Sequence, residues 1–387
     1  MIVTHLNAKN WRNFRQIDVD LRERQFIVGP NAAGKSNFLD MFRFLRDIAK
    51  REGGGLQKAI KDRGGVPKVR SLAARRDPEI SIELSFAESV GEPVAWRYGL
   101  GIRQDTRGHR LPRVAWENVW RGDEQILMRP NPDDRTDPQR LTQTFLEQIG
   151  ANAEFRVVAR FLETITYLHL VPQLLRHADQ IQGRIIEDDP FGQAFLERIA
   201  KTTEKRRRSR LRIIEDALQI AVPQLEQLRF VRDKESGRPH LEALYSHWRP
   251  HAGWQREDQF SDGTLRLIGL LWSLLEDESM LLLEEPEQSL NAAIVAQLAP
   301  VIHRVQKRRR RQVIISTHSD DLLNEKGIDG REVLMLSPAA EGTSVSVASD
   351  VAEIRVLLES GLSAGEAVLP RSNPARAEQL SLIDTAR

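Results

Sequence analysis

Apolar and polar positions alternate along the first third of the chain in short runs that are typical of β-strands. The pattern predicts strands over residues 2–8, 17–21, 79–86, 96–102 and 114–120. Short strands in close succession favour antiparallel pairing, because parallel neighbours need long crossover connections. We therefore expect an antiparallel sheet in this part of the chain.

Helical spacing of apolar residues appears first after residue 35, where Phe38, Met41, Phe42 and Leu45 form one stripe. It returns between residue 141 and about residue 228. The stretch 129–140 is rich in Pro, Asp and Asn, and it predicts a linker ahead of this helical part. No long heptad run is present, which argues against an extended coiled coil. We predict a helical lobe inserted into an α/β domain.

Unbroken apolar runs are typical of strands that are buried on both faces. Three runs of this kind lie within 25–28, 280–283 and 312–317. The second run ends at Glu284 and Glu285, and the third is followed by His318. Ligands of open α/β sheets bind beyond the carboxyl ends of the strands. These polar residues are therefore candidates for a binding site.

A glycine-bearing loop, Gly-Pro-Asn-Ala-Ala-Gly-Lys-Ser over residues 29–36, joins the first buried run to the first helix. A strand, such a loop and a helix together predict a phosphate-binding loop. Backbone N–H groups and the positive end of the helix attract phosphate, Lys35 reaches the β- and γ-phosphates, and the Ser36 hydroxyl binds Mg²⁺. The alternative is a glycine turn before an ordinary helix. The other expected nucleotide-binding residues of this segment are Asn31, Gly34 and Asn37.

A second anion site is predicted at the start of the apolar helix 265–275. There the segment 260–264 reads Phe-Ser-Asp-Gly-Thr. The Ser261 hydroxyl, the Gly263 N–H and the helix dipole can together bind an anion. Taken alone, the segment would indicate only a capped helix.

Composition narrows the class of protein. The 387 residues are 40% hydrophobic and 29% charged and include no cysteine, which excludes disulfides, thiolate metal sites and a cysteine nucleophile. No apolar run is long enough to span a membrane, and the first residues lack the pattern of a signal peptide. We expect a globular cytoplasmic protein.

Two basic runs, 206–212 and 307–311, stand out in a chain whose net charge is only +2. Runs of like charge are usually solvated and sometimes contact nucleic acid. The second run precedes the strand that leads to His318, so we expect it at the end of the sheet opposite the nucleotide. It is either a solvated loop or a docking surface for nucleic acid or an acidic partner.

These motifs, in this order, resemble the RecF/SMC-like branch of ABC-type ATPases. That branch includes single-chain AAA family ATPases of bacterial defence or DNA repair and the overcoming-lysogenisation-defect group. The segment 9–15, Lys-Asn-Trp-Arg-Asn-Phe-Arg, matches the segment that precedes the phosphate loop in these proteins. The resemblance implies an ABC-type P-loop ATPase head, an α/β fold with a mixed sheet, flanking helices and an antiparallel β part. Residues 1–140 and 251–387 would form the head, and 141–250 the inserted helical lobe.

The resemblance also implies roles for single residues. Arg12 would contact the nucleotide; the alternative is a solvent-exposed arginine in a turn. Glu284 would bind Mg²⁺ where relatives usually carry aspartate. Glu285 would orient the attacking water, and His318 would bond the γ-phosphate. Hydrolysis of ATP is expected to be slow, because the extra methylene at position 284 alters the metal contact.

The segment around Ser261 and Gly263 resembles the ABC signature motif, which closes over the nucleotide held by a second subunit. The resemblance therefore implies an ATP-dependent homodimer with shared sites. The chain departs from its relatives at 289–292, where Ser-Leu-Asn-Ala replaces a usual His-Pro. The glutamine that normally links Mg²⁺ to the helical lobe cannot be placed.

Three roles are compatible with such a head. An antiphage-defence ATPase would control a toxic effector, a RecF-type ATPase would act on DNA in repair, and a transporter ATPase would need a membrane partner. The first is favoured by resemblance and the last is the least favoured. Only 69 residues follow His318 in the 387-residue chain, too few for a Toprim nuclease domain. A nuclease effector is therefore expected to be a separate polypeptide.

Overall fold

The computed structural model describes residues 1–75, 77–105, 110–169, 171–176, 195–247, 253–276 and 280–372. The chain forms two compact units. The first consists of Met1–Thr166, Glu278–Leu282 and Arg310–Arg387, and the second of Tyr167–Asp277 and Leu283–Arg309. The division of the sequence at residues 140 and 250 stays a prediction.

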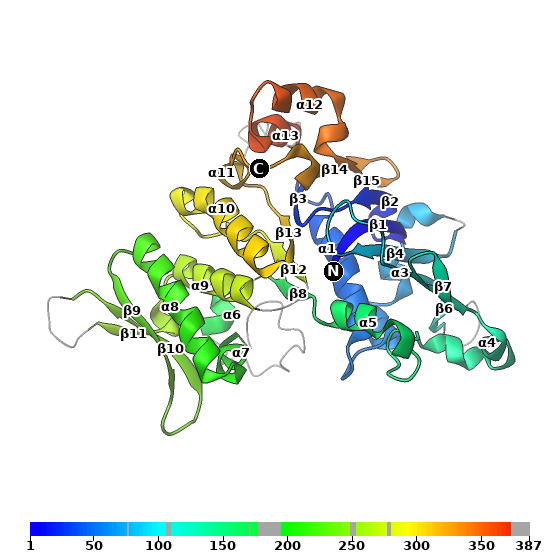
Figure 1. Cartoon of the computed structure of the whole chain (residues 1–387), viewed down its shortest axis with the longest axis horizontal. Helices are drawn as coiled ribbons and strands as arrows, with labels where there is room; N and C mark the ends of the chain where they lie inside the picture. The colour runs from blue at the N-terminus through cyan, green and yellow to red at the C-terminus, as the bar shows by residue number, and fades with distance from the viewer. Residues whose placement is uncertain are drawn as a thin grey trace, which may run out of the picture. The chain divides into compact units, whose positions relative to one another are not determined.

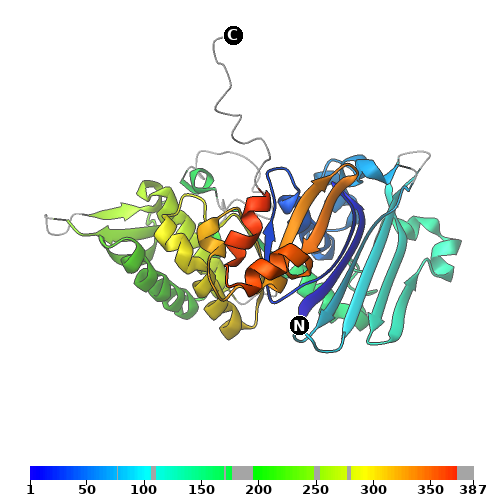
Figure 2. The ribbon, with the colours of Figure 1, turned by 90° about the horizontal axis from the view of Figure 1, so that it is seen from above.

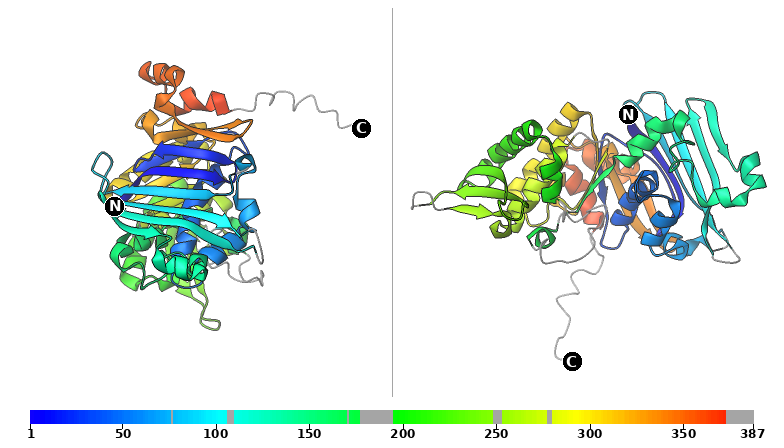
Figure 3. Two further views of the ribbon diagram at one scale, coloured as in Figure 1. Left: turned by 90° about the vertical axis from the view of Figure 1, so that its right-hand side faces the viewer. Right: turned by 90° about the horizontal axis from the view of Figure 1, so that it is seen from below.

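The first unit contains the antiparallel sheet that the alternating pattern predicts. Its strand order is β2-β1-β4-β5-β6-β7, and all neighbours are antiparallel. Figure 3, left, shows these strands side by side. Their bounds are β1 Ile2–Trp11, β2 Phe14–Asp20, β4 Ile80–Ala87, β5 Trp96–Gln104, β6 Pro112–Arg121 and β7 Glu124–Arg129.

A second, mixed sheet has the order β15-β14-β3-β13-β12-β8. Its central strand β3 is parallel to both β13 and β14, while β14 and β15 form an antiparallel hairpin. Seen from above, this hairpin lies beside the first strands of the antiparallel sheet (Figure 2). The bounds are β3 Arg24–Val28, β8 Thr166–Leu168, β12 Met280–Glu284, β13 Gln312–Ser316, β14 Val333–Ala339 and β15 Gly342–Val347.

Helix α1, Lys35–Ala49, joins the two sheets through its side chains. Its Phe44 ring lies 5.0 Å from the Trp11 ring of β1, and the helix also contacts β13. Most of its length is buried, so its start, just after β3, is held firmly. The other helices of this unit are α2 Leu56–Asp62, α3 Val66–Val69, α4 Pro132–Thr136, α5 Arg156–Glu163, α11 Asp320–Leu323, α12 Ala352–Glu359 and α13 Ala364–Ser372.

The prediction of a linker over 129–140 is wrong. The Arg129 side chain is fully buried, with its guanidinium 3.0 Å from Glu117 and 2.9 Å from Asp134. Asn131 caps α4 by accepting a hydrogen bond from the Asp134 N–H. Pro, Asp and Asn are favoured in capped turns as much as in linkers, so composition alone could not separate the two.

The second unit combines helices with a small antiparallel sheet of order β11-β10-β9 (Figure 1). The helices are α6 Pro172–Arg176, α7 Phe195–Lys201, α8 Glu204–Ala221, α9 Asp262–Leu275 and α10 Ala292–Arg309, and the strands are β9 Leu225–Arg232, β10 Pro239–Tyr245 and β11 Trp254–Arg256. The pattern predicts helix to about residue 228 and a helical lobe to residue 250, so the strands over 225–245 were missed. None of the helices in the described part of the chain has the length and apolar character of a membrane span.

Candidate functional site

The loop between β3 and α1 has the backbone that a phosphate-binding loop needs. Gly34 caps α1 with φ of 100°, a left-handed conformation that favours glycine. A Cβ at this position would lie 2.2 Å from Nδ2 of Asn13, so a larger residue would displace the Asn13 side chain. Asn31 and Ser36 are exposed, while Lys35 is 7% exposed. The loop is therefore a fixed turn that leads into the N-terminus of a buried helix.

Lys35 and His318 come together beside this loop. The Lys35 Nζ lies 3.0 Å from the Gly29 carbonyl oxygen, 3.4 Å from that of Pro30 and 2.5 Å from Nε2 of His318. A lysine ammonium has only donors, so in this contact Nε2 of the imidazole is the acceptor.

Parallel pairing explains this meeting. Ser316 at the end of β13 pairs with Ile27 near the end of β3, and the Thr317 N–H donates to the Ile27 carbonyl at 3.1 Å. Both strands therefore end at the same edge of the sheet. The two segments that follow them, 29–34 and 317–319, are brought together there as the apolar runs predict.

Arg12 lies in the turn between β1 and β2 and is held by Asp40 of α1. Its Nε and Nη2 lie 3.0 and 2.7 Å from Oδ2 of Asp40. Arg63 binds both oxygens of the same carboxylate, with its Nη2 2.8 Å from Oδ1. Burial alone would raise the pKa of Asp40, but the charges of Arg63, Arg12 and Arg43 outweigh it and lower that pKa. Asp40 is thus an ionised anchor for two guanidinium groups.

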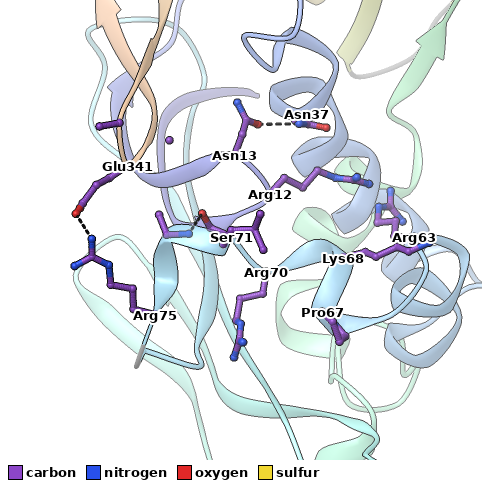
Figure 4. Close-up of a pocket in the computed structure, with 14 residues that line it drawn as sticks. Arg12, Asn13, Asn37, Arg63, Pro67, Lys68, Arg70, Ser71, Arg75 and Glu341 are labelled. Atoms are coloured by element: carbon purple, nitrogen blue, oxygen red, sulfur yellow. Dashed lines mark hydrogen bonds and ion pairs between the residues drawn. The ribbon is translucent and has the colours of Figure 1, made fainter.

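Asn37 and Asn13 connect α1 to this turn. The Asn37 amide donates to Oδ1 of Asn13 at 2.8 Å (Figure 4). Asn13 in turn donates to the Ala33 carbonyl and to the Thr343 hydroxyl, both at 2.8 Å. The phosphate loop, the β1–β2 turn and the hairpin β14–β15 are therefore joined by one asparagine.

A basic pocket of about 880 Å³ opens beside these asparagines (Figure 4). The Arg75 guanidinium binds Glu341, which also lines the pocket, at 2.7 Å. Within the described part of the chain, the side chains of Lys68 and Arg70 form no ion pair. Pro67 and the exposed Leu72 add apolar surface. The cations that line the pocket are Arg12, Arg63, Lys68, Arg70 and Arg75.

Two carboxylates follow the buried residues of β12 in the second unit. Glu284 accepts a hydrogen bond from the phenol of Tyr167 on β8. Glu285 has φ of 44° and accepts a hydrogen bond from the Gln288 amide. A left-handed backbone at a residue other than glycine costs free energy and is most frequent at functional sites.

Ser261 and Gly263 mark the start of α9, also in the second unit. The Ser261 hydroxyl is the N-cap and accepts from the Thr264 N–H at 3.1 Å. A Cβ at Gly263 would lie 2.7 Å from the Ser289 carbonyl oxygen, so this glycine allows close packing of two loops. Ser261 is exposed and Gly263 half-buried. The start of α9 can therefore present its N–H groups to a ligand.

The family of the chain is shown by a match to a protein-family profile. The profile described as "AAA domain, putative AbiEii toxin, Type IV TA system" matches residues 26–324, more than half of the chain. The chain belongs to this AAA domain family. The matched range includes Lys35, Ser261, Glu285 and His318.

Solved structures agree on the fold of this AAA domain. It is similar to an SMC head bound to the C-terminal winged-helix domain of ScpA, with a TM-score of 0.53 at 15% identity over 89% of this chain and 98% of that one. It is also similar to the SMC head of Pyrococcus furiosus with an extended coiled coil, with a TM-score of 0.50 at 14% identity over 92% and 99%. No curated protein matches the sequence. The fold is that of an ABC-type P-loop ATPase head.

Four polar residues that the sequence did not single out lie beside the candidate residues, two in each unit. They are Asp40, Arg63, Tyr167 and Gln288. Asp40 lies beside the apolar stripe of a helix, and a carboxylate that is buried there requires a cation. This signal could have indicated that Asp40 has a cationic partner, which is Arg63 in the structure. Nothing local marks Tyr167 or Gln288.

The residues of the two basic runs, 206–212 and 307–311, are not all exposed. On α8, Arg206, Arg208 and Arg212 are exposed, whereas Arg210 is buried over the Trp272 ring. In 307–311 the first residues end α10, and Arg311 is only 3% exposed. The reading of this run as five surface charges is therefore wrong, because its last arginine enters the core with β13.

Proposed function

We propose that this AAA domain binds and hydrolyses ATP. The observation that carries the proposal is the meeting of Lys35 and His318 at the N-terminus of α1. Lysine, backbone N–H groups and a helix dipole at one place favour phosphate. On binding, the Lys35 ammonium would turn from the Gly29 and Pro30 carbonyls to the β- and γ-phosphates. The loop 31–34 would surround them with N–H groups.

We place the nucleoside end of ATP in the basic pocket beside the loop. The support for this is that Asn13 lines the pocket and also bonds the phosphate loop, while Asn37 lines the pocket and follows the loop. Pro67 and Leu72 offer apolar surface for a base. Arg12 would contact the nucleotide from its place on Asp40.

We propose Mg²⁺ as the cofactor on the chemistry of the oxygen donors. In the described ranges no three His, Cys, Asp or Glu side chains form a group that could hold a metal ion by themselves. Mg²⁺ is typically bound by one or two protein oxygens together with phosphates and water, and the Ser36 hydroxyl and Glu284 carboxylate are such donors. When bound, the ion would neutralise charge on the β- and γ-phosphates.

In the proposed reaction Glu285 orients the attacking water and accepts its proton, while His318 bonds the γ-phosphate. A carboxylate can take this role because it is a hydrogen-bond acceptor near neutral pH. Glutamate at position 284 reaches further than aspartate, so it would hold the metal less firmly. We expect slow turnover for this reason.

We further propose that two copies share two sites. Ser261 and Gly263 would bind the γ-phosphate held by the partner, with the hydroxyl and N–H groups at the start of α9. A two-fold dimer uses the same surface on both copies, so both sites form together. Dimerisation would then depend on ATP.

For the biological role, we propose that the ATPase controls a separate effector, a nuclease, in cytoplasmic antiphage defence. The family description, with its toxin and type IV toxin–antitoxin system, supports a defence role. The similar SMC head in complex with a domain of ScpA is a precedent for a partner on this fold. Co-purification with the products of neighbouring genes would test this role, and a membrane permease as the partner would contradict it.

A DNA-repair role of the RecF type is the second candidate, and the exposed Arg206, Arg208 and Arg212 of α8 favour it. If they bind duplex DNA, replacing all three by serine should reduce the salt dependence of binding by about 0.9 per lost phosphate contact. An unchanged salt dependence would remove these residues from any nucleic-acid interface.

Complementation tests the shared site. Lys35→Ala removes the phosphate ligand of its own subunit, and Ser261→Arg blocks the site of its partner. Each variant alone should be inactive, but a mixture should regain about one working site per heterodimer, since both defects fall on the same interface. Phosphate release is the measurement. Two folded variants whose mixture stays inactive would contradict the shared site.

A further inference from the structure

A short series of side chains connects helix α9 to Glu285. The Gln288 Nε2 donates to the Glu285 carboxylate, and the Gln288 Oε1 accepts from Nη2 of Arg266 at 3.1 Å. Arg266 belongs to α9, five positions after Ser261. All four residues lie in the second unit.

The charges on either side fix the orientation of the Gln288 amide. Its NH₂ group must face the anion of Glu285, and its oxygen must face the cation of Arg266. A flipped amide would place acceptor against acceptor and donor against donor. Gln288 is therefore matched to this place, and neither a carboxylate nor an ammonium group could bond both neighbours.

Part of the Arg266 guanidinium has lost its contact with water. Its Nε is buried and has no hydrogen-bond partner among the described residues. Burial lowers the pKa of Arg266, while the charges of Asp262, Glu285 and Glu287 act in the opposite direction. A buried polar group without a partner needs an explanation. A role in holding Gln288 supplies one.

The backbone ties the same two segments together. The segment 285–289 begins and ends with left-handed residues, Glu285 at φ of 44° and Ser289 at φ of 61°. The Ser289 carbonyl lies against Gly263, where a Cβ would come within 2.7 Å of its oxygen. Movement of the start of α9 toward this carbonyl would therefore displace the segment that carries Glu285.

From these contacts we infer that Gln288, itself oriented by Arg266, is a positioning residue that sets the direction of the Glu285 carboxylate according to the position of α9. The inference rests on the proposed function. Because the start of α9 would bind the partner's nucleotide, the series of bonds makes hydrolysis at one site respond to occupancy of the other. Cooperative hydrolysis follows from it.

Gln288→Leu removes both hydrogen bonds at similar volume, and Gln297→Leu on the exposed face of α10 is the matched control. Misdirected catalytic groups cost about 10- to 100-fold in rate. We expect this loss in kcat for Gln288→Leu, with ATP affinity unchanged and a Hill coefficient near 1. The control should keep the wild-type kcat and Hill coefficient.

Gln288→Glu provides a second readout, which a merely structural role would not move. It can still accept from Arg266, but it places a negative charge beside Glu285, which raises the pKa of that group. Glu285 must be ionised to accept a proton, so the acidic limb of the pH–rate profile should move to higher pH. Arg266→Lys, which keeps a donor, should retain more cooperativity than Arg266→Met.

Wild-type kcat and Hill coefficient in folded Gln288→Leu would overturn the inference while leaving the proposed function intact. If Gln288→Leu fails to fold, an unshifted pH profile in Gln288→Glu would overturn it equally. A wild-type protein that binds no ATP would overturn the proposed function and this inference together.

Discussion

The surroundings of Asp40 and of Glu285 are both expected to serve the nucleotide, but they are constructed differently. Asp40 and Arg63 are almost fully buried, and Arg63 binds Asp47 at 2.8 Å as well. Glu285 is half-buried and follows β12 with a left-handed backbone. Buried ionic contacts on a regular helix keep one arrangement, whereas a strained, partly hydrated loop can change. We therefore expect the contacts of Asp40 to keep one arrangement, whereas the Glu285 carboxylate can move during hydrolysis.

Glu285→Gln tests the movable side of this comparison and should have the largest effect. The amide cannot accept a proton, so we expect the rate of hydrolysis to fall by about 10²- to 10⁴-fold. ATP binding should be unchanged, and dimers should accumulate in size-exclusion chromatography with ATP. Glu226→Gln, at an exposed position of β9, is the control. Wild-type turnover in Glu285→Gln would remove this residue from the mechanism.

Asp40→Asn tests the fixed side. It leaves the buried guanidinium of Arg63 without the carboxylate charge of Asp40, and we expect the free energy of unfolding to fall by about 3 kcal/mol. Asp62→Asn is the control, since its ion pair with Lys58 is exposed and worth about 0.3–0.5 kcal/mol. Urea unfolding measures both. Equal, small losses of unfolding free energy in the two variants would show that the buried contacts of Asp40 stabilise the fold no more than an exposed ion pair does.

Two tyrosines allow a contrast between a hydrogen bond to the carboxylates after β12 and a hydrogen bond in the buried core of the first unit. Tyr167→Phe removes a bond to Glu284, and loss of such a support typically costs about 10-fold or more in metal affinity. We expect a matching rise in the Mg²⁺ concentration needed for tight ATP binding. Tyr98→Phe removes a buried bond to Glu117 in the first unit and should cost about 1 kcal/mol of stability without altering the Mg²⁺ requirement. The same Mg²⁺ response in both variants would contradict the contrast.

The smallest effect concerns pH. The pKa of Asp40 is lowered in the folded protein, so its charge stabilises the fold above the ordinary pKa of about 3.9, and this stability is lost as the pH falls through the folded value. The difference in unfolding free energy between wild type and Asp40→Asn should be constant from about pH 8 to 5 and shrink below about pH 4. A decline that begins near neutral pH would point to a different group.

Local features of the sequence were enough to predict β3, β12, β13 and the loop 29–36. Their signals are unbroken apolar runs and a glycine-bearing turn, which involve only neighbouring residues. Contacts between distant residues left no such signal, as with Tyr167 and Glu284, which are 117 positions apart. The strand β9 was missed because its polar residues pack across the sheet: Arg229 lies over the Trp254 ring at 3.6 Å.

The contacts of Gln312 join residues that are synthesised far apart in time. Its buried amide bonds the Val3 backbone, 309 positions away, and β3 has both of its partners, β13 and β14, in the last quarter of the chain. At ribosomal speeds of about 5–20 residues per second, roughly 15 to 60 seconds separate these segments. During that time β3 waits with unpaired edges, which invite aggregation. Chaperone protection of the nascent chain should therefore matter more for this protein than for one whose sheet is built from consecutive strands.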